Sequence, residues 1–263
     1  MLINKKIMSR YLKRHRFDLL MQLIKTSFKM RYQNSVLGVL WVLIKPYSTF
    51  FVLYSVRLSA AHNVIENYAL YLLTGIVIFN FFSEMVTQGQ MGLLDRANII
   101  LKVNFPRQIV IVSVLINSLI NLLINFVFIL FICVTTIGIT VWGILYFLFV
   151  CFVLLLFSFG LSLFTSIITV RFRDLKNIFD LVLFLLYWVT PIFFVFGVDQ
   201  LANSSYLLSN PIGVLMNQAR AGLQIYGTID IPLVLAYLFA ALVFALIGWV
   251  FFNSKIKKIA EFF

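Results

Sequence analysis

Six stretches of this sequence are each apolar enough, and long enough, to cross a lipid bilayer as a helix. A helix needs ~20 apolar residues to span a hydrocarbon core of ~30 Å. Hydrophobic residues make up 62% of the 263 positions, which leaves little sequence for a soluble domain. The predicted fold class is therefore an all-α polytopic membrane protein with a single transmembrane domain over residues 1–263. Its six predicted spans cover residues 36–56, 68–86, 108–137, 141–170, 178–198 and 231–252.

Lys and Arg alternate with these spans in a way that predicts the orientation of the chain. Eighteen of the 21 Lys and Arg residues fall in four segments, which are residues 1–35, 87–107, 171–176 and the tail from 255. The connections on the other side of the predicted membrane contain only Arg220. Cytoplasmic segments retain Lys and Arg during insertion, so both termini are expected in the cytoplasm. Topology and anionic lipid headgroups account for the net charge of +12, and no nucleic-acid partner is predicted.

Several kinds of chemistry are excluded by what the sequence lacks. No Gly-x4-Gly-Lys-Ser/Thr loop is present, and no Gly-Lys pair occurs at all, so the chain is not expected to bind ATP or to be an enzyme by itself. His15 and His62 fall on opposite sides of the predicted membrane, so no metal site is expected. Cys133 and Cys151 lie inside spans and are interpreted as packing residues. No cofactor is therefore predicted for this chain.

Polar residues within the spans are few and are expected to avoid lipid. Asn117, Asn121 and Asn125 recur once per turn of the third span, so they should face protein or water, and hydrogen bonding between helices is favoured over pore lining. Glu84 is one of two acids near or within spans, and this scarcity argues against transport driven by ion coupling. Lys45 precedes Pro46, which should kink the first span.

Three segments outside the spans have a mixed character. Residues 13–30 carry apolar side chains at helical spacing and cations opposite, which predicts an interfacial helix that either anchors the chain or supports a cytosolic partner. Residues 88–101 are polar and Gly-rich but include apolar pairs, which predicts a short amphipathic helix. Residues 203–226 are too polar to cross and too apolar for a free loop, which predicts two short re-entrant helices in the outer leaflet.

Several short motifs resemble one known family when they are taken in order and at their spacing. They are Arg31-Tyr32 with Leu37-Gly38-Val39-Leu40-Trp41 and Pro46, Lys102-Val103-Asn104-Phe105-Pro106-Arg107, Arg171-Phe172-Arg173-Asp174-Leu175, Thr190-Pro191-Ile192, and Asn210-Pro211 followed by Arg220. Together with six spans they resemble the permease subunits of type-2 ATP-binding-cassette polysaccharide exporters, of the Wzm, KpsM and TarG types. Lys45 departs from the family, which more often has an uncharged residue there.

The resemblance implies a partner set and a location. It implies a multi-pass homodimer in a bacterial inner or plasma membrane, paired with two copies of a separate ATPase that binds ATP and Mg. It implies export of lipid-linked O-antigen (lipopolysaccharide), capsule or teichoic acid. It also maps residues 88–101 to a cytosolic coupling helix, residues 13–30 to a helix flanking the ATPase, and residues 203–226 to gate helices.

Three groups of site residues follow from the resemblance. Aromatic rings stack on sugar faces without fixing one hydroxyl pattern, so the expected substrate path contains Trp41, Tyr47, Phe51, Tyr54, Tyr187 and Trp188, for which helix packing is the alternative. The expected ATPase-coupling residues are Leu93, Leu94, Asp95, Arg96, Ile99, Lys102, Arg171, Arg173 and Asp174, where a plain topology signal is the alternative for the last three. The expected outer gate contains Asn210, Pro211 and Arg220.

Two rival functions remain open at this stage. A related exporter of small amphiphiles or drugs would act without a polymer pathway. A membrane-embedded enzyme or scaffold would show a cluster of acids or His at one membrane face, and the sequence places no such cluster there.

Overall fold

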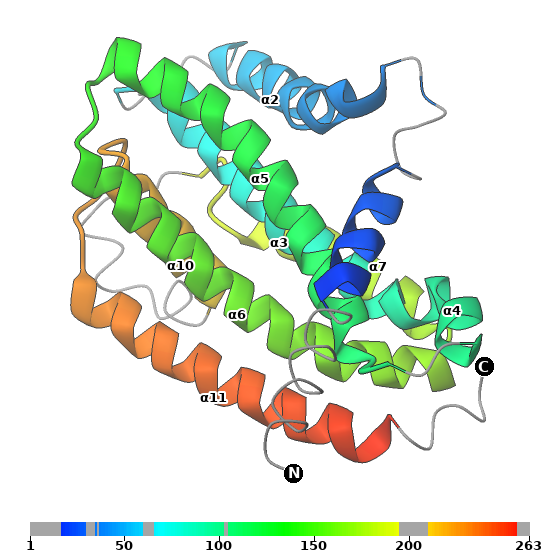
Figure 1. The fold of residues 1–263 in the computed structure, drawn as a ribbon. Coiled ribbons are helices and arrows are strands. Elements are labelled where there is room, and N and C mark those ends of the chain that lie inside the picture. The colour runs from blue at the N-terminus through cyan, green and yellow to red at the C-terminus, as the bar shows by residue number, and fades with distance from the viewer. Residues whose placement is uncertain are drawn as a thin grey trace.

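The computed structural model describes residues 17–29, 35, 37–59, 66–102, 105–194 and 210–256. These segments form helices and connecting turns, and the described residues contain no strand, so the all-α class is confirmed for this part of the chain. A helix over residues 17–29 comes first. It is followed by η1 (Gly38–Leu40), α2 (Trp41–Ser59), α3 (Tyr68–Asp95), α4 (Ala97–Lys102), α5 (Gln108–Thr136), α6 (Val141–Arg171), α7 (Leu175–Val189), α10 (Pro211–Gly222) and α11 (Ile231–Lys255) (Figure 1).

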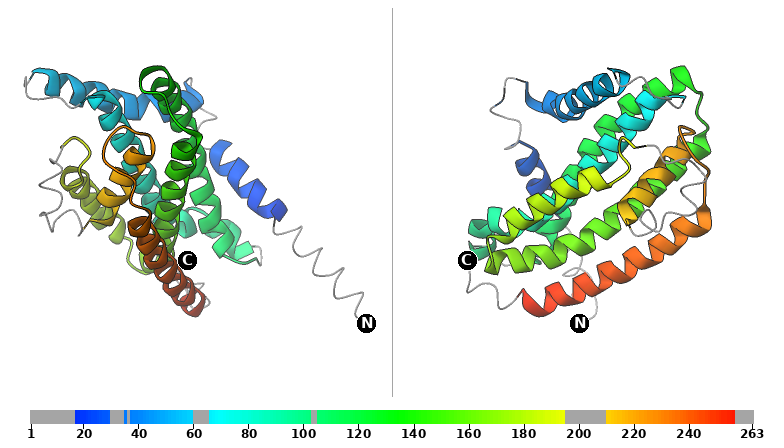
Figure 2. Two further views of the ribbon diagram at one scale, coloured as in Figure 1. Left: turned by 90° about the vertical axis from the view of Figure 1, so that its left-hand side faces the viewer. Right: turned by 180° about the vertical axis from the view of Figure 1, so that it is seen from behind.

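Five segments are long and apolar enough to cross a membrane, which confirms five of the six expected spans. They are Gly38–Arg57, Tyr68–Asp95, Gln108–Thr136, Val141–Arg171 and Ile231–Lys255. The chain is therefore a multi-pass membrane protein. Helices α3, α5, α6 and α11 run along one another, whereas α2 is steeply inclined to them and packs on α3 and α5 (Figures 1 and 2).

The fifth expected span, residues 178–198, is the one not confirmed, and it corresponds to a shorter helix. Helix α7 has 15 residues, or about 22 Å of helix, which by itself is less than a ~30 Å hydrocarbon core. It ends at Val189 because Thr190, the residue before Pro191, has extended backbone angles (φ −76°, ψ 141°). The ring of a proline disfavours helical angles in the preceding residue. Residues 195–209, which hold the last four residues of this expected span and the start of the expected gate region, lie outside the described residues.

Helix α3 is longer than the second predicted span, residues 68–86. It continues through the Gly-rich residues 88–92 and ends at Asp95, and α4 begins at Ala97. The glycines favour a loop in the sequence, but here they allow close helix packing. A Cβ atom on Gly89 would lie 2.1 Å from the Ser162 hydroxyl oxygen of α6. Residues 88–101 are thus divided between the end of α3 and α4.

Helix α6 is the centre of the bundle, with α3, α10 and α11 packed around it. Glycines occupy the crossing points. A Cβ atom on Gly143 of α6 would lie 2.1 Å from the Gly222 carbonyl oxygen of α10. A Cβ atom on Gly248 of α11 would lie 2.8 Å from the Gly160 carbonyl oxygen of α6. Without a hydrophobic force between helices in lipid, such close backbone approach supplies much of the packing energy.

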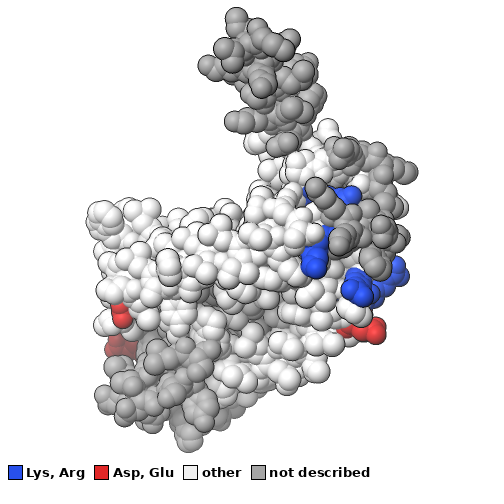
Figure 3. Space-filling view, turned by 90° about the horizontal axis from the view of Figure 1, so that it is seen from below, with Lys and Arg blue, Asp and Glu red and all other residues white. Residues whose placement is uncertain are grey.

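Basic side chains gather at one end of the bundle. The ends of α3, α6 and α11 and the starts of α5 and α7 meet there (Figure 1). On the face of the molecule that Figure 3 shows, the Lys and Arg surfaces lie at that end, together with some acidic surface. Most of the basic segments of the sequence are thereby brought together at one end of the bundle.

Candidate functional site

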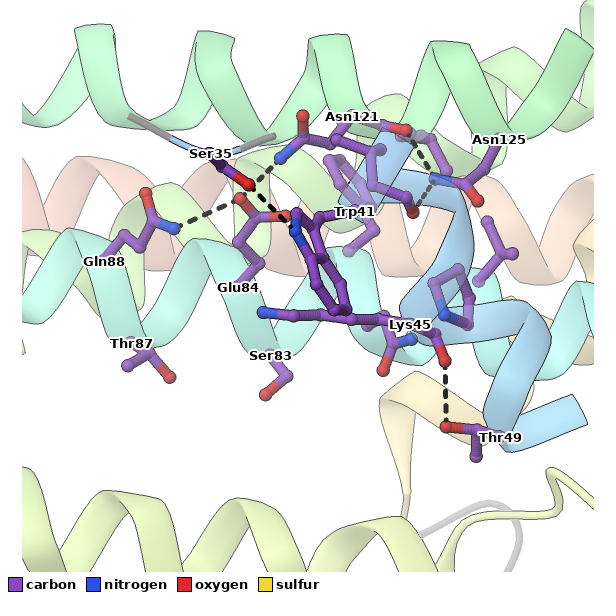
Figure 4. A pocket seen from close by; sticks show the side chains of 16 residues that line it. Ser35, Trp41, Lys45, Thr49, Ser83, Glu84, Thr87, Gln88, Asn121 and Asn125 are labelled. Carbon is purple, nitrogen blue, oxygen red and sulfur yellow. Dashed lines mark hydrogen bonds between the residues drawn. The ribbon is translucent and has the colours of Figure 1, made fainter. Parts of the chain in front are cut away.

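A polar cavity of about 860 Å³ lies between α2, α3 and α5, among helices that are otherwise apolar. Figure 4 shows Lys45, Glu84 and Asn121 pointing toward one another from the three helices, whereas Ser83 and Thr87 project on the side of α3 away from α5. The polar and charged residues that line it, together with Trp41, are Ser35, Lys45, Thr49, Asn80, Ser83, Glu84, Thr87, Gln88, Asn121 and Asn125.

Helical spacing explains why these side chains meet. Residues three or four positions apart lie on one face of a helix. On α5 the pair Asn121 and Asn125 follows this spacing, and on α2 the series Trp41, Lys45 and Thr49 does so. On α3 the lining positions from 80 to 88 likewise fall on one side. Each of the three helices therefore presents a polar stripe to the same space.

Glu84 is the centre of the hydrogen bonding around the cavity. Its Oε1 atom accepts from Asn121 Nδ2 at 2.7 Å and from Gln88 Nε2 at 3.1 Å. A carboxyl group within a spanning helix is costly unless it has such partners, and its position then marks a functional site by default. The sequence placed Glu84 near the end of a span but gave no sign of its partner Asn121, because that contact depends on how α3 packs on α5.

The asparagines of α5 serve two purposes that the sequence presented as alternatives. Asn125 Nδ2 donates to the Asn121 carbonyl oxygen at 2.8 Å and to the Val42 carbonyl oxygen of α2 at 3.3 Å. Asn121 and Asn125 also line the cavity. Asn117 is buried away from it, and its Oδ1 atom has no partner among the described residues.

The six aromatic residues expected in the substrate path do not gather at one place. Trp41 lines the cavity, where its indole Nε1 atom donates to Ser35 Oγ at 3.1 Å. Tyr47 is half-buried and packs edge-on against Phe128.

The other four lie further along α2 or on α7. Phe51 is 66% exposed. Tyr54 stacks on Tyr68, with ring centroids 6.4 Å apart. Tyr187 packs edge-on against Trp188, which is 47% exposed. Only Trp41 of the six lines the polar cavity.

Arg220, expected in the outer gate, is completely buried and holds two other segments to α10. Its Nη1 and Nη2 atoms donate to the carbonyl oxygens of Pro191 and Ile192, at 2.8 and 3.0 Å, after α7. Its Nε atom donates to the Tyr71 carbonyl oxygen of α3 at 3.1 Å, and its guanidinium carbon lies 3.5 Å from the centre of the Tyr71 ring. Burial lowers the pKa of Arg220 to about 10, so the side chain remains charged at neutral pH.

Asn210 and Pro211 fix the start of α10. Asn210 Oδ1 accepts from the backbone N–H groups of Ile212 and Gly213, which would otherwise be unpaired at a helix start. Its Nδ2 atom donates to Thr190 Oγ1 at 3.0 Å. Pro211 occupies the first helical position, where a missing N–H has no cost. The three expected gate residues therefore belong to one assembly that joins α10 to the end of α7. Tyr71 was missed in the sequence because nothing there links it to Arg220.

The expected ATPase-coupling residues differ in exposure. Leu93 is buried in the core and Leu94 is partly buried. Arg96 is partly buried and donates to Ser27 Oγ, which connects the α3–α4 turn to the 17–29 helix. Asp95 and Ile99 are exposed at the basic end. The Lys102 side chain lies outside the described residues.

The short turn between α6 and α7 is fully exposed at the same end. Arg171, Arg173 and Asp174 all present their side chains to the surface there. This turn and the exposed residues around α4 are the available contact surface of the basic end.

Comparison with known proteins shows similarity over much of the chain. A family model described as ABC-2 type transporter matches residues 18–200. A Klebsiella pneumoniae protein named O-antigen export system permease protein RfbA is 28% identical over 251 residues, covering 93% of this chain and 95% of that protein. A Myxococcus xanthus protein of the same name is 28% identical over 205 residues, covering 77% of this chain and 79% of that protein.

Proposed function

Because this chain belongs to the ABC-2 type transporter family, we propose that it is the membrane subunit of an ATP-driven exporter of O-antigen polysaccharide. The observation that carries the proposal is the polar cavity between α2, α3 and α5, since a hydrated polymer needs hydrogen-bonding groups within an apolar bundle. The likeness to O-antigen permeases over nearly the whole chain supports the choice of substrate.

The energy for export comes from a separate chain in this proposal. The family implies an ATP-binding partner, and we assign ATP and Mg to that partner. Two ATPase copies would bind a homodimer of this chain at the basic end, against the exposed residues within 88–101 and the exposed turn from Arg171 to Asp174. The 17–29 helix would flank the same partner, because Arg96 connects it to the α3–α4 turn.

The proposed topology has six spans and two cytoplasmic termini. The gathering of Lys and Arg at one end supports a cytoplasmic position for that end. Helix α7 would belong to the fifth span together with residues that follow it. Helix α10 has 12 residues, too few to cross, and would be one of the re-entrant helices at the outer face.

Deletion of the gene tests this function directly. We expect the surface polysaccharide to disappear and lipid-linked glycan to accumulate inside the cell, and we expect the intact gene to restore export. Co-purification of the tagged chain should recover the ATPase. Unchanged surface polysaccharide combined with a loss of dye or drug efflux would contradict the proposal and favour an exporter of small amphiphiles.

A further inference from the structure

A second cavity, an apolar groove of about 550 Å³, lies where the 17–29 helix meets α5 and η1. It shares no described lining residue with the polar cavity. Its wall combines apolar side chains from all three elements with two lysines from one of them. The described side chains that line the apolar groove are Ile24, Phe28, Val39, Ile120, Lys25 and Lys29.

Helical spacing explains why both lysines lie along one edge of the apolar groove. Lys25 and Lys29 are four residues apart, as are Ile24 and Phe28, and residues at this spacing lie on one face of a helix. The two pairs are adjacent around the helix, which therefore presents an apolar strip beside a basic strip. Both lysine side chains are exposed, whereas Ile24 is buried. This arrangement fits an amphiphile with a hydrocarbon chain and an anionic headgroup.

The position of the apolar groove favours a membrane lipid over a soluble partner. Ile120 is separated from Gln108, the first residue of α5 at the basic end, by about 18 Å of helix. This part of α5 belongs to a segment that is long and apolar enough to cross a membrane. The wall at Ile120 is therefore at the depth of acyl chains, and a cytosolic protein would have to enter the hydrocarbon region to reach it.

The charges in the wall favour an anionic headgroup. Among the described side chains that line the apolar groove, two are lysines and none is acidic. Basic pockets beside membrane-spanning helices bind phosphate-containing headgroups. The apolar stem of a lysine can follow a hydrocarbon wall while its ammonium group reaches the headgroup layer. A zwitterionic lipid would bring a cation of its own against the two ammonium groups.

The apolar groove fits a phospholipid better than a lipid that carries a glycan. Both ligands have a phosphate group and hydrocarbon chains. Sugar rings next to the phosphate would need several hydrogen-bonding partners, and the two lysines are the only polar side chains among the described residues of the wall. A volume of about 550 Å³ is within the range of about 300–1,000 Å³ that is typical of sites for one small ligand.

We propose that the apolar groove binds one anionic phospholipid, with an acyl chain against Ile24, Val39 and Ile120 and the phosphate group paired with Lys25 and Lys29. The lipid then acts as a structural ligand that joins the 17–29 helix to α5. The site goes beyond the proposed function and does not depend on it.

Occupancy of the apolar groove should determine how firmly the 17–29 helix is attached. A helix of this length is marginal by itself in water. The contacts that attach it include the buried side chain of Leu23 and the hydrogen bond from Arg96 to Ser27. An acyl chain held between the helix and α5 adds apolar contact to these, so the bound lipid should slow local opening of the helix.

Lipid retention by the purified chain measures the binding. Dioleoyl phosphatidylglycerol, dioleoyl phosphatidylcholine and inorganic phosphate are titrated separately in detergent, and bound molecules are counted by native mass spectrometry. We expect one phosphatidylglycerol per chain to bind in preference to phosphatidylcholine, and no retention of inorganic phosphate, which has no acyl chain. Equal retention of the two lipids would identify unspecific boundary lipid and overturn the proposal. Retention of inorganic phosphate alone would also overturn it.

The double variant Lys25→Gln with Lys29→Gln tests the headgroup contact. It should bind phosphatidylglycerol about thirtyfold more weakly, which is the effect of two lysines at an anionic lipid surface. Lys176→Gln with Lys255→Gln is the matched control, because it removes two exposed charges outside the apolar groove. The control should bind as the wild type does. An equal loss in both double variants would show that net charge, and not the apolar groove, attracts the lipid.

Hydrogen exchange tests where the lipid binds. Phosphatidylglycerol should slow the exchange of backbone amides in the 17–29 helix of the wild type, and it should not do so in the Lys25→Gln, Lys29→Gln variant. Unchanged exchange in the wild type at a saturating lipid concentration would place the lipid elsewhere and contradict the proposal.

Competition distinguishes a phospholipid from a lipid that carries glycans. Polyprenyl phosphate is added to the chain after phosphatidylglycerol has bound. We expect it to displace the phospholipid only at concentrations above those at which phosphatidylglycerol itself saturates the site. Displacement at lower concentrations would assign the apolar groove to the glycan carrier instead.

Discussion

Arg220 connects three segments that are far apart in the sequence. Its guanidinium group donates to carbonyl oxygens in α3 and after α7, and Gly75 leaves the room it needs, because a Cβ atom there would lie 2.2 Å from Arg220 Nη2. A planar fork of five N–H donors can satisfy several acceptors at once, and a lysine ammonium cannot reproduce that geometry.

We expect Arg220→Lys to destabilise the fold by about 2–3 kcal/mol, because buried carbonyl oxygens lose their donors. The midpoint of thermal unfolding in detergent would measure the loss. Arg173→Lys, at an exposed position, should leave the midpoint unchanged. Equal midpoints for the two variants would show that the hydrogen bonds of Arg220 contribute nothing measurable.

At the residue scale, the sequence predicts which polar side chains avoid lipid better than it predicts their hydrogen-bond partners. The recurrence of Asn121 and Asn125 at helical spacing was enough to place them on one protected face. The contacts of Glu84 with Asn121 and of Arg220 with Tyr71 could not be predicted, since they join residues 37 and 149 positions apart and depend on the packing of whole helices.

Among the helices, α6 has the closest contacts, and these depend on glycine. Gly143→Ala should force α6 and α10 apart, because the added methyl group would meet a backbone oxygen that cannot turn away. We expect the free energy of unfolding to fall by about 1–3 kcal/mol, which is the usual cost of overpacking. The midpoint of thermal unfolding again measures it.

Gly92→Ala on α3 is the matched control for that change. The nearest atoms to its new Cβ would be side-chain carbons at 3.4 Å, and alanine favours a helix by up to ~1 kcal/mol over glycine. Its midpoint should stay the same or rise. If Gly143→Ala is tolerated as well as Gly92→Ala, the close crossing of α6 and α10 is not under packing constraint.

The turn between α6 and α7 provides the test of the coupling surface. Asp174→Lys should reduce recovery of the ATPase in co-purification and slow export, because it reverses an exposed charge at the proposed interface. Glu66→Lys makes the same change at an exposed position just before α3. This position lies at the end of α3 away from the basic end, so it is the control. Equal recovery of the ATPase by both variants would show that this turn serves topology alone.

At the element scale, hydropathy located the long helices but not all of their ends. The apolar runs correspond to α2, α3, α5, α6 and α11 because long helices in a bilayer need continuous apolar sequence. The end of α3 was placed too early, since glycines that read as a loop are used for packing. The early end of α7 is set by Pro191, whose effect on Thr190 is local and could have been read from the sequence.

For the whole molecule, the proposed orientation can be tested by labelling from one side of the membrane. After replacement of Cys133 and Cys151, a single cysteine is placed at Val141, the first residue of α6, or at Lys255, at the end of α11. A membrane-impermeant maleimide added to spheroplasts should label the first and not the second. Val141 suits the test because it is 71% exposed. Labelling at Lys255 instead would reverse the orientation.

Helix α3 connects three of the features described above. It has 28 residues without a proline, or about 42 Å of helix. Tyr71 meets Arg220 near its start, Glu84 faces the cavity, and Arg96 follows directly after its end. A continuous helix of this length has no break at which a movement driven by the ATPase could be taken up locally. We therefore expect the polar cavity and the hydrogen bonds of Arg220 to move together in the same step of the transport cycle. Spin labels at Ala69 and Met91, both on α3, should keep a constant separation throughout that cycle.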